Sequence, residues 1–416
     1  MEDRSIAVVG GGLVGLCTAF HLMRRGAAVT VIDRSFGLDG ASSGNAGSLS
    51  PGAVLPVAYR GMVRDIPRML LDPEGPLRVT PGGLVRHAGW LARFLREGRQ
   101  ERIRAAAGTM AKLIPASLAK HTELLDAIGS SDLLRADGQL HLYPDAEARE
   151  RDRFGWELRR AHGVVAHELT RDELLEVEPS IGPGYTAGVF LPHQGMIVDP
   201  GDYVGRLRGV LRQSGATLVE DEVRTVETGA GGKVRLVGAR QTLECEEMVL
   251  CAGAWSADVV RRLGVRIPLA NQRGFHVSFA DSGVALQRVV VIADRKVFVT
   301  PMRRGLRAAG TVEITPLSAK VDMRRAEALV GHVQRVWPQV RTEPRERWSG
   351  ERPCLPDSLP VMGPCQGHPN VWFNFGHGHV GLTLSAVCGE EIAKSMAARR
   401  PSELVRLFDH TRFADA

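Results

Sequence analysis

Three glycines within residues 10–15, followed by an aspartate at residue 33, have the types and spacing of a nucleotide-binding turn. Residues 10–15 read GGGLVG and fit G-x-G-x-x-G through Gly10, Gly12 and Gly15, and Asp33 follows 18 residues later. The first glycine permits a tight turn, the second lets backbone approach a pyrophosphate, and the third lets a helix pack closely on a strand. Asp33 can accept hydrogen bonds from an adenosine ribose and would repel a 2′-phosphate. The predicted ligand is therefore FAD or NAD.

A second group of residues that could bind a metal or a cofactor lies in the segment NFGHGHVGLTLS, from Asn374 to Ser385. His377 and His379 alternate with glycines and lead into an apolar stretch. A metal site would need a third ligand, and no other histidine or cysteine stands at ligand spacing, so no metal is predicted. A helix starting near Gly381 instead offers N–H groups to an anion or a carbonyl oxygen.

The loop after Asp33 and a later strand carry further groups suited to a dinucleotide. The loop reads RSFGLDGASSGNAGSLSPG and offers Ser42, Ser43 and Asn45 as hydrogen-bonding groups. It either reaches back over a diphosphate and the edge of a flavin or is a flexible surface loop, and its composition leaves both open. The segment LECEEMVLCAGAWS reads as a strand ending near residue 252, a second junction of the kind that FAD-binding folds supply.

Together these segments resemble the D-amino-acid oxidase superfamily of FAD-dependent amine oxidoreductases. The most similar branch is the D-amino-acid dehydrogenase small-subunit type, which includes the cis-4-hydroxy-D-proline dehydrogenases. The resemblance covers nearly the whole chain. Its markers are VVGGGLVG…VID, ASSGNAG, ADGQLHLYP at 136–144, GMIVDP at 195–200, LRAAGTVEI at 306–314, RPCLPDSLPVMGP at 352–364 and GHGHVGLTLS at 376–385. The last two are the most specific.

The resemblance implies FAD held without a covalent bond. It places GHGHVGLT over the flavin ring, with N–H groups at the helix start facing the pyrimidine carbonyls. Some relatives attach flavin through a cysteine, but Cys354 follows the Arg-Pro pair and stands out of register. The residues predicted to contact FAD are Gly10, Gly12, Leu13, Val14, Gly15, Asp33, Arg34, Ser42, Ser43, Asn45, Ala46, Gly47, Val223, Ala252, Gly253, Gly378, His379, Val380, Gly381, Leu382 and Thr383.

A flavoenzyme that oxidises amines must also hold the carboxylate of an amino acid. Arginine offers a planar, bidentate partner for a carboxylate, and lysine does not. In related enzymes this arginine begins the RP…PD segment, and Arg352 matches it. The predicted catalytic residues are Arg352 and His379, and His276 joins Arg352 in the predicted substrate site. For both histidines a purely structural role is the alternative.

One departure from the family concerns the electron acceptor. In sarcosine oxidases a lysine in the corresponding strand activates oxygen over the flavin, whereas this sequence has Arg307 there. This difference favours an acceptor other than oxygen, such as a quinone or an electron-transfer protein. It also adds Arg307 to the predicted substrate site.

The leading hypothesis is FAD-dependent oxidative dehydrogenation of a D-amino or D-imino acid, such as cis-4-hydroxy-D-proline, D-proline or D-alanine. The resemblance implies hydride transfer from Cα to flavin N5, and the imine product hydrolyses or cyclises. Two alternatives stay open. One is a sarcosine- or glycine-type oxidase that makes hydrogen peroxide, and the other is a flavin-binding subunit without turnover.

Two domains must position these residues. The expected class is α/β: a Rossmann-like FAD-binding domain of the glutathione-reductase type, with an inserted α+β substrate domain built on a mostly antiparallel sheet. Residues 1–50, 165–264 and 350–416 form the predicted FAD-binding domain, and residues 51–164 and 265–349 the substrate-binding domain. Alternating strand patterns at 133–165 and 265–346 predict the antiparallel sheet.

The segments between these strands are helical in pattern. Residues 107–129 carry apolar residues at helical spacing. Residues 84–98 read LVRHAGWLARFLREG and combine Trp90 and Phe94 with arginines. Such a basic amphipathic helix either packs on the protein's own sheet or lies on a membrane surface, where it would deliver electrons to quinones.

Composition excludes other classes. The 416 residues carry a net charge of +6 without a dense Lys/Arg block and with only four tyrosines, so nucleic-acid binding is not predicted. The six cysteines form no C-x-x-C pair, which favours a reducing cytoplasm. No transmembrane segment or export signal is predicted. The expected location is the cytoplasm, with contact to the inner face of its membrane left open, and no oligomeric state is predicted.

Overall fold

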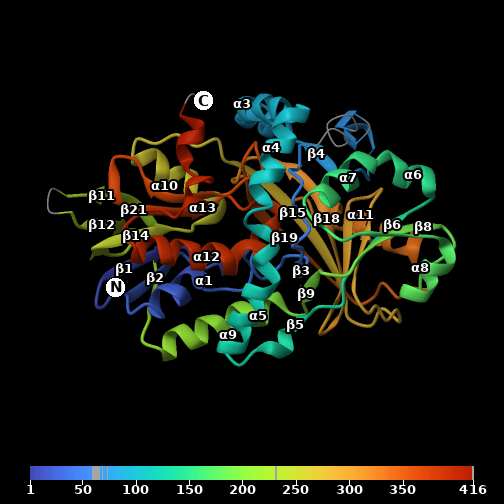
Figure 1. Cartoon of the computed structure of the whole chain (residues 1–416), viewed down its shortest axis with the longest axis horizontal. Coiled ribbons are helices and arrows are strands. Elements are labelled where there is room, and N and C mark those ends of the chain that lie inside the picture. The colour runs from blue at the N-terminus through green and yellow to red at the C-terminus, as the bar shows by residue number, and fades with distance from the viewer. Residues whose placement is uncertain (59–65, 68, 73, 230–231, 415–416) are drawn as a thin grey trace.

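The computed structural model describes residues 1–58, 66–67, 69–72, 74–229 and 232–414. Parts of two predicted domain ranges, 59–65, 68 and 73 in one and 230–231 with 415–416 in the other, lie outside the described residues. Helices cover two large sheets that lie in different parts of the molecule (Figure 1). The α/β class predicted from the sequence is confirmed.

The first large sheet is parallel apart from one edge strand. Its strands, in spatial order, are β10 (Thr217–Glu220), β2 (Ala28–Asp33), β1 (Ser5–Val9), β14 (Glu247–Leu250), β21 (His368–Phe375) and β20 (Val361–Cys365). Only β20 runs antiparallel to its neighbour. Four of the five residues of β1 are buried, as expected for a central strand covered on both faces.

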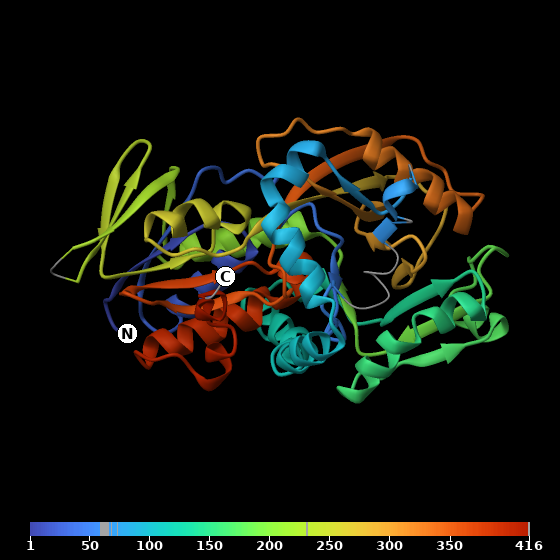
Figure 2. The same ribbon diagram turned by 90° about the horizontal axis from the view of Figure 1, so that it is seen from above.

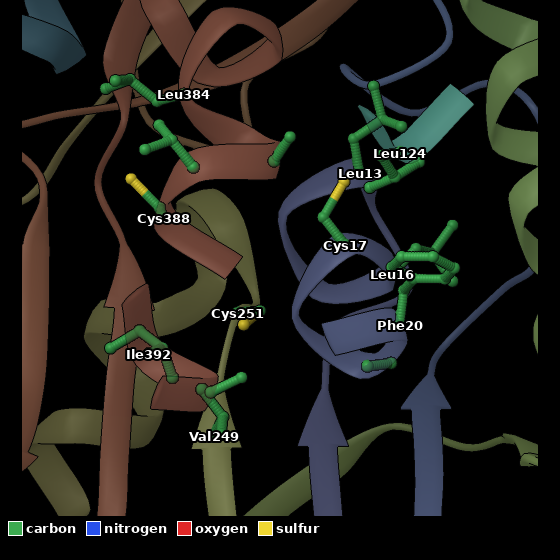
Figure 3. Close-up of a cluster of buried hydrophobic side chains, with 14 of the residues drawn as sticks. Leu13, Leu16, Cys17, Phe20, Leu124, Val249, Cys251, Leu384, Cys388 and Ile392 are labelled. Carbon is green, nitrogen blue, oxygen red and sulfur yellow. The ribbon is translucent and has the colours of Figure 1, made fainter. Parts of the chain in front are cut away.

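Two long helices pack side by side against this sheet. They are α1 (Leu13–Met23), which follows β1, and α12 (Gly381–Ala397), which follows β21. Figure 3 labels members of the buried apolar cluster that both helices share, among them Leu16 and Cys17 on α1 and Leu384 and Cys388 on α12. A Cβ at Gly389 would lie 2.8 Å from the backbone of α1, so this close approach depends on a glycine.

The second large sheet is mostly antiparallel. In spatial order its strands are β19 (Arg345–Cys354), β15 (Ala270–Phe279), β18 (Gly305–Ile314), β17 (Val297–Met302), β16 (Val289–Ile292), β6 (Gln139–Tyr143), β8 (Ala187–Leu191) and β7 (His167–Leu169), while β4 (Leu77–Val79) pairs with β18. The pairs β16–β6 and β18–β4 are parallel. Helix α11 (Arg324–Val336) packs on one face of this sheet through a separate apolar core.

Two small sheets and further helices lie around the two large sheets in the described part of the chain. The small sheets are β11 (Val223–Thr228), β12 (Val234–Gly238) and β13 (Thr242–Cys245), and β3 (Ser48–Leu49), β9 (Gly195–Ile197) and β5 (Leu134–Arg135). The other helices are α3 (Pro81–Glu97), α4 (Gln100–Met110), α5 (Ser117–Ala127), α6 (Ala146–Arg151), α7 (Arg153–Ala161), α8 (Arg171–Val177), α9 (Pro200–Gln213), α10 (Ser256–Arg262) and α13 (Glu403–Arg406). In Figure 2 the β11–β13 sheet lies at the opposite end of the molecule from α6–α8.

Strand pairing divides the chain differently from the predicted boundaries. Strands β7 and β8 lie in the range 165–264 but pair into the second sheet. Helices α4 and α5 lie in the range 51–164 but contribute to the core around α1 and α12. Two details of the helical pattern also differ. Residues 146–161 form helices rather than strands, and the helix expected at 107–129 is interrupted at Pro115, whose ring cannot continue it.

The basic amphipathic helix α3 turns its aromatic residues inward. Trp90 and Phe94 are 5% and 8% exposed and stack on each other, and the Trp90 indole donates a hydrogen bond to the Cys354 carbonyl oxygen. Arg86 and Arg96 are exposed. The helix therefore covers part of the second sheet. Within the described residues, no helix has the length and apolar character needed to cross a bilayer.

Candidate functional site

One large cavity, of about 1730 Å³, lies between the two sheets. It is larger than the roughly 300–1,000 Å³ typical of single small-molecule sites. Its lining runs from the glycine-rich turn after β1, past the 42–50 loop, to the start of α12, the face of β15, β18 and β19, and helix α3. A long ligand and a second, smaller molecule both have room in it.

The glycine-rich turn has the tight geometry predicted for it. Gly10 has φ +117°, and a Cβ there would lie 2.3 Å from the Cys251 carbonyl oxygen. A Cβ at Gly15 would lie 1.8 Å from the Gly10 carbonyl oxygen. Gly15 therefore serves the packing of α1 on β1 and does not line the cavity. Gly12 caps α1 without a side chain, which leaves the helix start open to the cavity.

Asp33 and Arg34 lie at the far end of the cavity from the second sheet. The Asp33 carboxylate accepts hydrogen bonds from the N–H groups of Gly11, at 2.5 Å, and Ser35, at 3.0 Å. The Arg34 guanidinium stands 3.5 Å above the ring centre of Trp255. Trp255 was not among the cofactor contacts predicted from the sequence, although it closely follows two residues that were, Ala252 and Gly253.

The 42–47 loop is ordered by contacts with α1 and with the second sheet. The Leu13 N–H donates to Ser42 Oγ at 2.9 Å, and Asn45 Oδ1 accepts from the Gly47 N–H at 2.8 Å. The Arg307 guanidinium donates to the Asn45 carbonyl oxygen at 2.8 Å. The carbonyl oxygens of Gly44 and Ala46 are held in the same way, by the His276 ring and the Thr300 hydroxyl.

His276 and Arg307 are thus placed differently from the sequence prediction. Neither lines the cavity, because both lie behind the loop whose carbonyl oxygens they bind, His276 buried and Arg307 partly buried. Trp348 stacks on the His276 ring at 5.0 Å and is itself part of the lining. Burial, followed by the nearby Arg307 charge, lowers the pKa of His276 to about 3. Both residues position the loop rather than face a substrate.

The segment from Asn374 to Thr383 closes the cavity on the other side. The Asn374 Oδ1 and His377 Nε2 atoms are buried and lack a hydrogen-bond partner, although both residues line the cavity. The His379 side chain is exposed to the cavity. Desolvation by the surrounding cavity walls, followed by the Arg352 charge, lowers its pKa and so favours the neutral imidazole.

Arg352 lies in the cavity wall on β19. Its guanidinium covers Gly274 of the neighbouring strand, where a Cβ would come within 2.0 Å of the Arg352 Cζ atom. Within the described part of the chain its hydrogen-bond partner is the Thr311 carbonyl oxygen, at 3.3 Å, and no carboxylate forms an ion pair with it. Arg352 is partly buried, and the resulting desolvation lowers the pKa of its guanidinium, yet arginine keeps its charge. A partly buried cation without a counter-ion favours an anionic ligand.

A bulge in β18 brings Thr311 to this guanidinium. The β15–β18 register shifts between Arg273 and Phe275, so β18 has one residue more than its partner. Thr311 has φ +54°, an unusual conformation for a β-branched residue, and its buried Oγ1 lacks a hydrogen-bond partner. Strained residues of this kind are found at functional sites. The sequence offered no signal for the bulge, because it arises from pairing between distant strands.

Most of the predicted cofactor contacts meet at this one cavity. Those that line it are Gly10, Gly12, Leu13, Val14, Asp33, Arg34, Ser42, Ser43, Asn45, Ala46, Val223, Ala252, Gly253, Gly378, His379, Val380, Gly381, Leu382 and Thr383. Gly15 and Gly47 do not. Among the described residues, no cluster of three His, Cys, Asp or Glu side chains could hold a metal ion.

The cysteines are free, buried thiols. Cys251 lines the cavity, but burial raises its pKa to about 12. Burial also raises the pKa of Cys354 to about 12, and Cys354 is not part of the lining. A thiol with so high a pKa is a poor nucleophile, which agrees with a cofactor held without a covalent bond.

Comparison with known proteins supports these observations. Residues 5–395 match the family DAO, described as FAD dependent oxidoreductase. The chain is 34% identical to a D-amino-acid oxidase of Bradyrhizobium diazoefficiens, over 99% of both chains. It is 27% identical to a D-amino acid dehydrogenase of Chromohalobacter salexigens, over 95% of this chain and 96% of that one.

Solved structures share the fold at low sequence identity. The glycine oxidase of Geobacillus kaustophilus matches with a TM-score of 0.76 and 20% identity over 99% of both chains. The L-proline dehydrogenase of P. horikoshii matches with a TM-score of 0.71 and 17% identity over 100% of this chain and 98% of that one. The family match over residues 5–395, together with the relative of 34% identity, shows that the chain belongs to the DAO family of FAD-dependent oxidoreductases.

Proposed function

We propose that this protein catalyses the FAD-dependent oxidative dehydrogenation of a D-amino or D-imino acid. The observation that carries the proposal is Arg352, a partly buried guanidinium in the wall of the cofactor cavity with no ion-pair partner among the described residues. The preference for D-substrates rests on the relatives named D-amino-acid oxidase and D-amino acid dehydrogenase.

The residues that line the cavity fit FAD. Gly10 and Gly12 line the cavity at the start of α1, where N–H groups and the helix dipole favour an anion such as a pyrophosphate. Asp33 is the acceptor for ribose hydroxyls. Asn374 Oδ1 and His377 Nε2, buried in the wall without partners, offer polar contacts to the ring system. The start of α12 near Gly381 supplies N–H donors for the pyrimidine oxygens.

Arg352 binds the substrate carboxylate and so fixes the amino acid in one orientation. Its planar fork suits the two carboxylate oxygens, and the contact to the Thr311 carbonyl oxygen holds the guanidinium over Gly274. His379 stays neutral beside it, because a second positive charge there is disfavoured by desolvation and by Arg352. In this position the neutral His379 imidazole can form a hydrogen bond with the substrate while remaining uncharged.

The reaction converts an amine into an imine. Bound FAD supplies the acceptor for the Cα hydrogen and its electron pair, at N5 of the ring. The substrate amine loses one N–H proton to solvent, and a C=N bond forms in place of the C–H and N–H bonds. Water then hydrolyses an open-chain imine to an oxo acid and ammonia, while an imino acid such as D-proline or cis-4-hydroxy-D-proline gives a cyclic imine.

Two electron acceptors stand as candidates. An acceptor other than oxygen, such as a quinone or an electron-transfer protein, is supported by several relatives named D-amino acid dehydrogenase. Oxygen is supported by the relative of 34% identity that is named D-amino-acid oxidase. Arg307 supports neither, because it lies behind the 42–47 loop. Oxygen uptake with and without a dye acceptor separates the two.

Anaerobic titration of the purified protein with D-, L- and N-methyl amino acids tests the proposal. We expect the visible flavin band to bleach with D-amino or D-imino acids. Bleaching only by L-amino acids, or only by sarcosine and glycine, would overturn it. A flavin that dithionite reduces but no amino acid does would identify a binding subunit without turnover.

The Arg352→Met variant tests the role of the arginine. Loss of a charge-assisted contact costs about 2–5 kcal/mol, so kcat/KM should fall by at least roughly 30-fold, mainly through KM. Bound flavin per chain should not change. The matched control is Arg347→Met on the same strand, which removes a surface ion pair with Glu327. Equal kinetic effects of the two substitutions would contradict the assignment.

A further inference from the structure

The cavity beside Arg352 continues into an apolar compartment that cofactor binding does not use. The strand register places Arg352, Gln272 and Ile314 opposite one another on β19, β15 and β18, and therefore on one face of the sheet. On β4, Leu77 pairs with Val312 and Val79 with Ile314. Apart from Gln272, the described residues that these pairings place on the cavity face beyond Arg352 carry aliphatic side chains.

Helix α3 covers this face. Its residues Leu84, Trp90, Leu91, Phe94 and Leu95 all line the cavity, opposite the aliphatic side chains of β18 and β4. Trp90, Phe94 and Ile314 belong to one buried cluster, and Leu77, Val79, Leu91 and Val312 pack against it while partly exposed. We call this compartment, between α3 and the β18–β4 edge, the apolar subsite.

The subsite lies within reach of a substrate held by Arg352. The guanidinium lies over Gly274 and touches Thr311, the residue next to Val312 in the chain. Leu77 on β4 lies one strand beyond Val312, and neighbouring strands are about 4.8 Å apart. A methyl group on the Cα of a bound substrate is too short to reach from Arg352 to β4. An aromatic or branched aliphatic side chain can fill this space.

The charges near the cavity do not favour an acidic substrate side chain. On the opposite face of the sheet, Arg273 is paired with Glu351 and Glu313. Among the described residues of the substrate domain, two cations line the cavity and both have partners: Lys296 Nζ lies 3.7 Å from the Asp152 carboxylate, and the Arg159 guanidinium stacks on Trp156 at 4.5 Å. Within this described part of the wall, the surface left for a side chain next to Arg352 is the apolar one.

We propose that the apolar subsite selects D-amino acids with large, uncharged apolar side chains, in preference to alanine or the hydroxylated imino acids. This inference rests on the proposed function, since it takes Arg352 as the carboxylate anchor. Filling the subsite removes the exposed apolar surface of Leu77, Leu91 and Val312 from water, and each apolar group buried in this way favours binding. A hydroxyl placed there would lose its hydrogen bonds to water.

Steady-state kinetics of the flavin-loaded protein test the preference. We expect kcat/KM for D-phenylalanine and D-leucine to exceed that for D-alanine and cis-4-hydroxy-D-proline by at least roughly tenfold, the scale of discrimination that apolar pockets achieve. A higher kcat/KM for either of the two small substrates would overturn the inference.

The Leu91→Ala variant locates the effect on α3. It should lower kcat/KM for D-phenylalanine by roughly tenfold and leave D-alanine within about twofold, because only a long side chain reaches this position. Val85→Ala, on the same helix but 83% exposed and outside the lining, is the matched control. An equal loss for both substrates in Leu91→Ala would show that the change acts on the fold and not on the subsite.

A binding measurement separates this inference from the proposed function. Phenylacetate and propionate carry a carboxylate but no amine, and their binding can be followed as a shift of the visible flavin spectrum without any turnover. We expect phenylacetate to have a Kd at least roughly tenfold lower, with the difference lost in Leu91→Ala. If no amino acid reduces the flavin but this difference is found, the proposed function fails and the apolar subsite stands. Equal Kd values overturn the subsite.

Discussion

At the scale of single residues, the site depends on positions where the lack of a side chain makes room for another group. Gly274 is the clearest example, because the Arg352 guanidinium occupies the place that its Cβ would take. The group that would be displaced is the far end of a flexible side chain, not backbone. A substitution there therefore changes the site more than it changes the fold.

The Gly274→Ala variant should bind substrate weakly while keeping its stability and its flavin. The added methyl group pushes the guanidinium away from Thr311 and out of line with the substrate carboxylate, so KM should rise by roughly tenfold or more, as expected for a misplaced charged contact. Steady-state kinetics, flavin content and the melting temperature measure the three effects. A large loss of melting temperature would show instead that the strand cannot accept the methyl group.

The sequence predicted one part of the site at this scale and missed another. The glycines of residues 10–15 were found because each has a local steric task that depends only on spacing along the chain. Thr311 and Gly274 were missed because their roles arise from the register of three strands far apart in the sequence. His276 and Arg307 do lie next to the site, but the 42–47 loop folds over them, and such coverage cannot be read from alternation along a strand.

At the scale of elements, the cofactor cavity depends on the packing of α1 against α12. Both helices direct their N-termini to the cavity, and their axes approach closely because Gly389 has no Cβ. Asn374 adds a buried hydrogen bond to the Thr18 hydroxyl at 3.0 Å, which ties β21 to α1. A change in the distance between these helices moves both halves of the cofactor site.

The Gly389→Ala variant should separate the two helices and weaken flavin binding. Its Cβ would lie 2.8 Å from the backbone of Cys17 and Thr18, and overpacking of this kind costs about 1–3 kcal/mol. We expect a lower melting temperature and a higher Kd for FAD, measured by flavin fluorescence. The control is Gly205→Ala on α9, where a Cβ meets nothing within 4 Å and helix propensity favours alanine. Unchanged FAD affinity in Gly389→Ala would contradict this account.

Several elements were predictable because their pattern is local. The β1–α1–β2 unit and the start of α12 lie where apolar periodicity and glycines place them. The assignment of α4, α5, β7 and β8 to one domain or the other was not predictable in this way. It depends on which core their apolar faces meet, and amphipathic spacing shows only that such a face exists.

At the scale of the whole molecule, buried neutral histidines make stability depend on pH. Burial is the main cause that lowers the pKa of His21 and His121 to about 4 and that of His276 and His377 to about 3, from an ordinary 6.5. Below pH 6.5 the unfolded chain binds protons at these histidines and the folded chain does not. The free energy of unfolding therefore falls as the pH is lowered.

We expect a marked loss of stability between pH 6.5 and about 4. Each of these four histidines contributes about 2 kcal/mol of destabilisation at pH 5, since the difference from 6.5 is 1.5 pH units and one unit corresponds to about 1.4 kcal/mol. Melting temperatures across this range measure the effect, and His121→Gln should reduce the slope more than His167→Gln, which changes an exposed side chain. A flat profile would contradict the assignment.

The pairing of α1 with α12 also sets the order of events during synthesis. The Thr18–Asn374 hydrogen bond spans 356 residues, and β1 finds its neighbour β14 only after about 240 residues have been added. At roughly 5–20 residues per second, the apolar face of α1 waits many seconds for its partner. Most of the chain between α1 and α12 is therefore synthesised before the two halves of the cofactor site can meet.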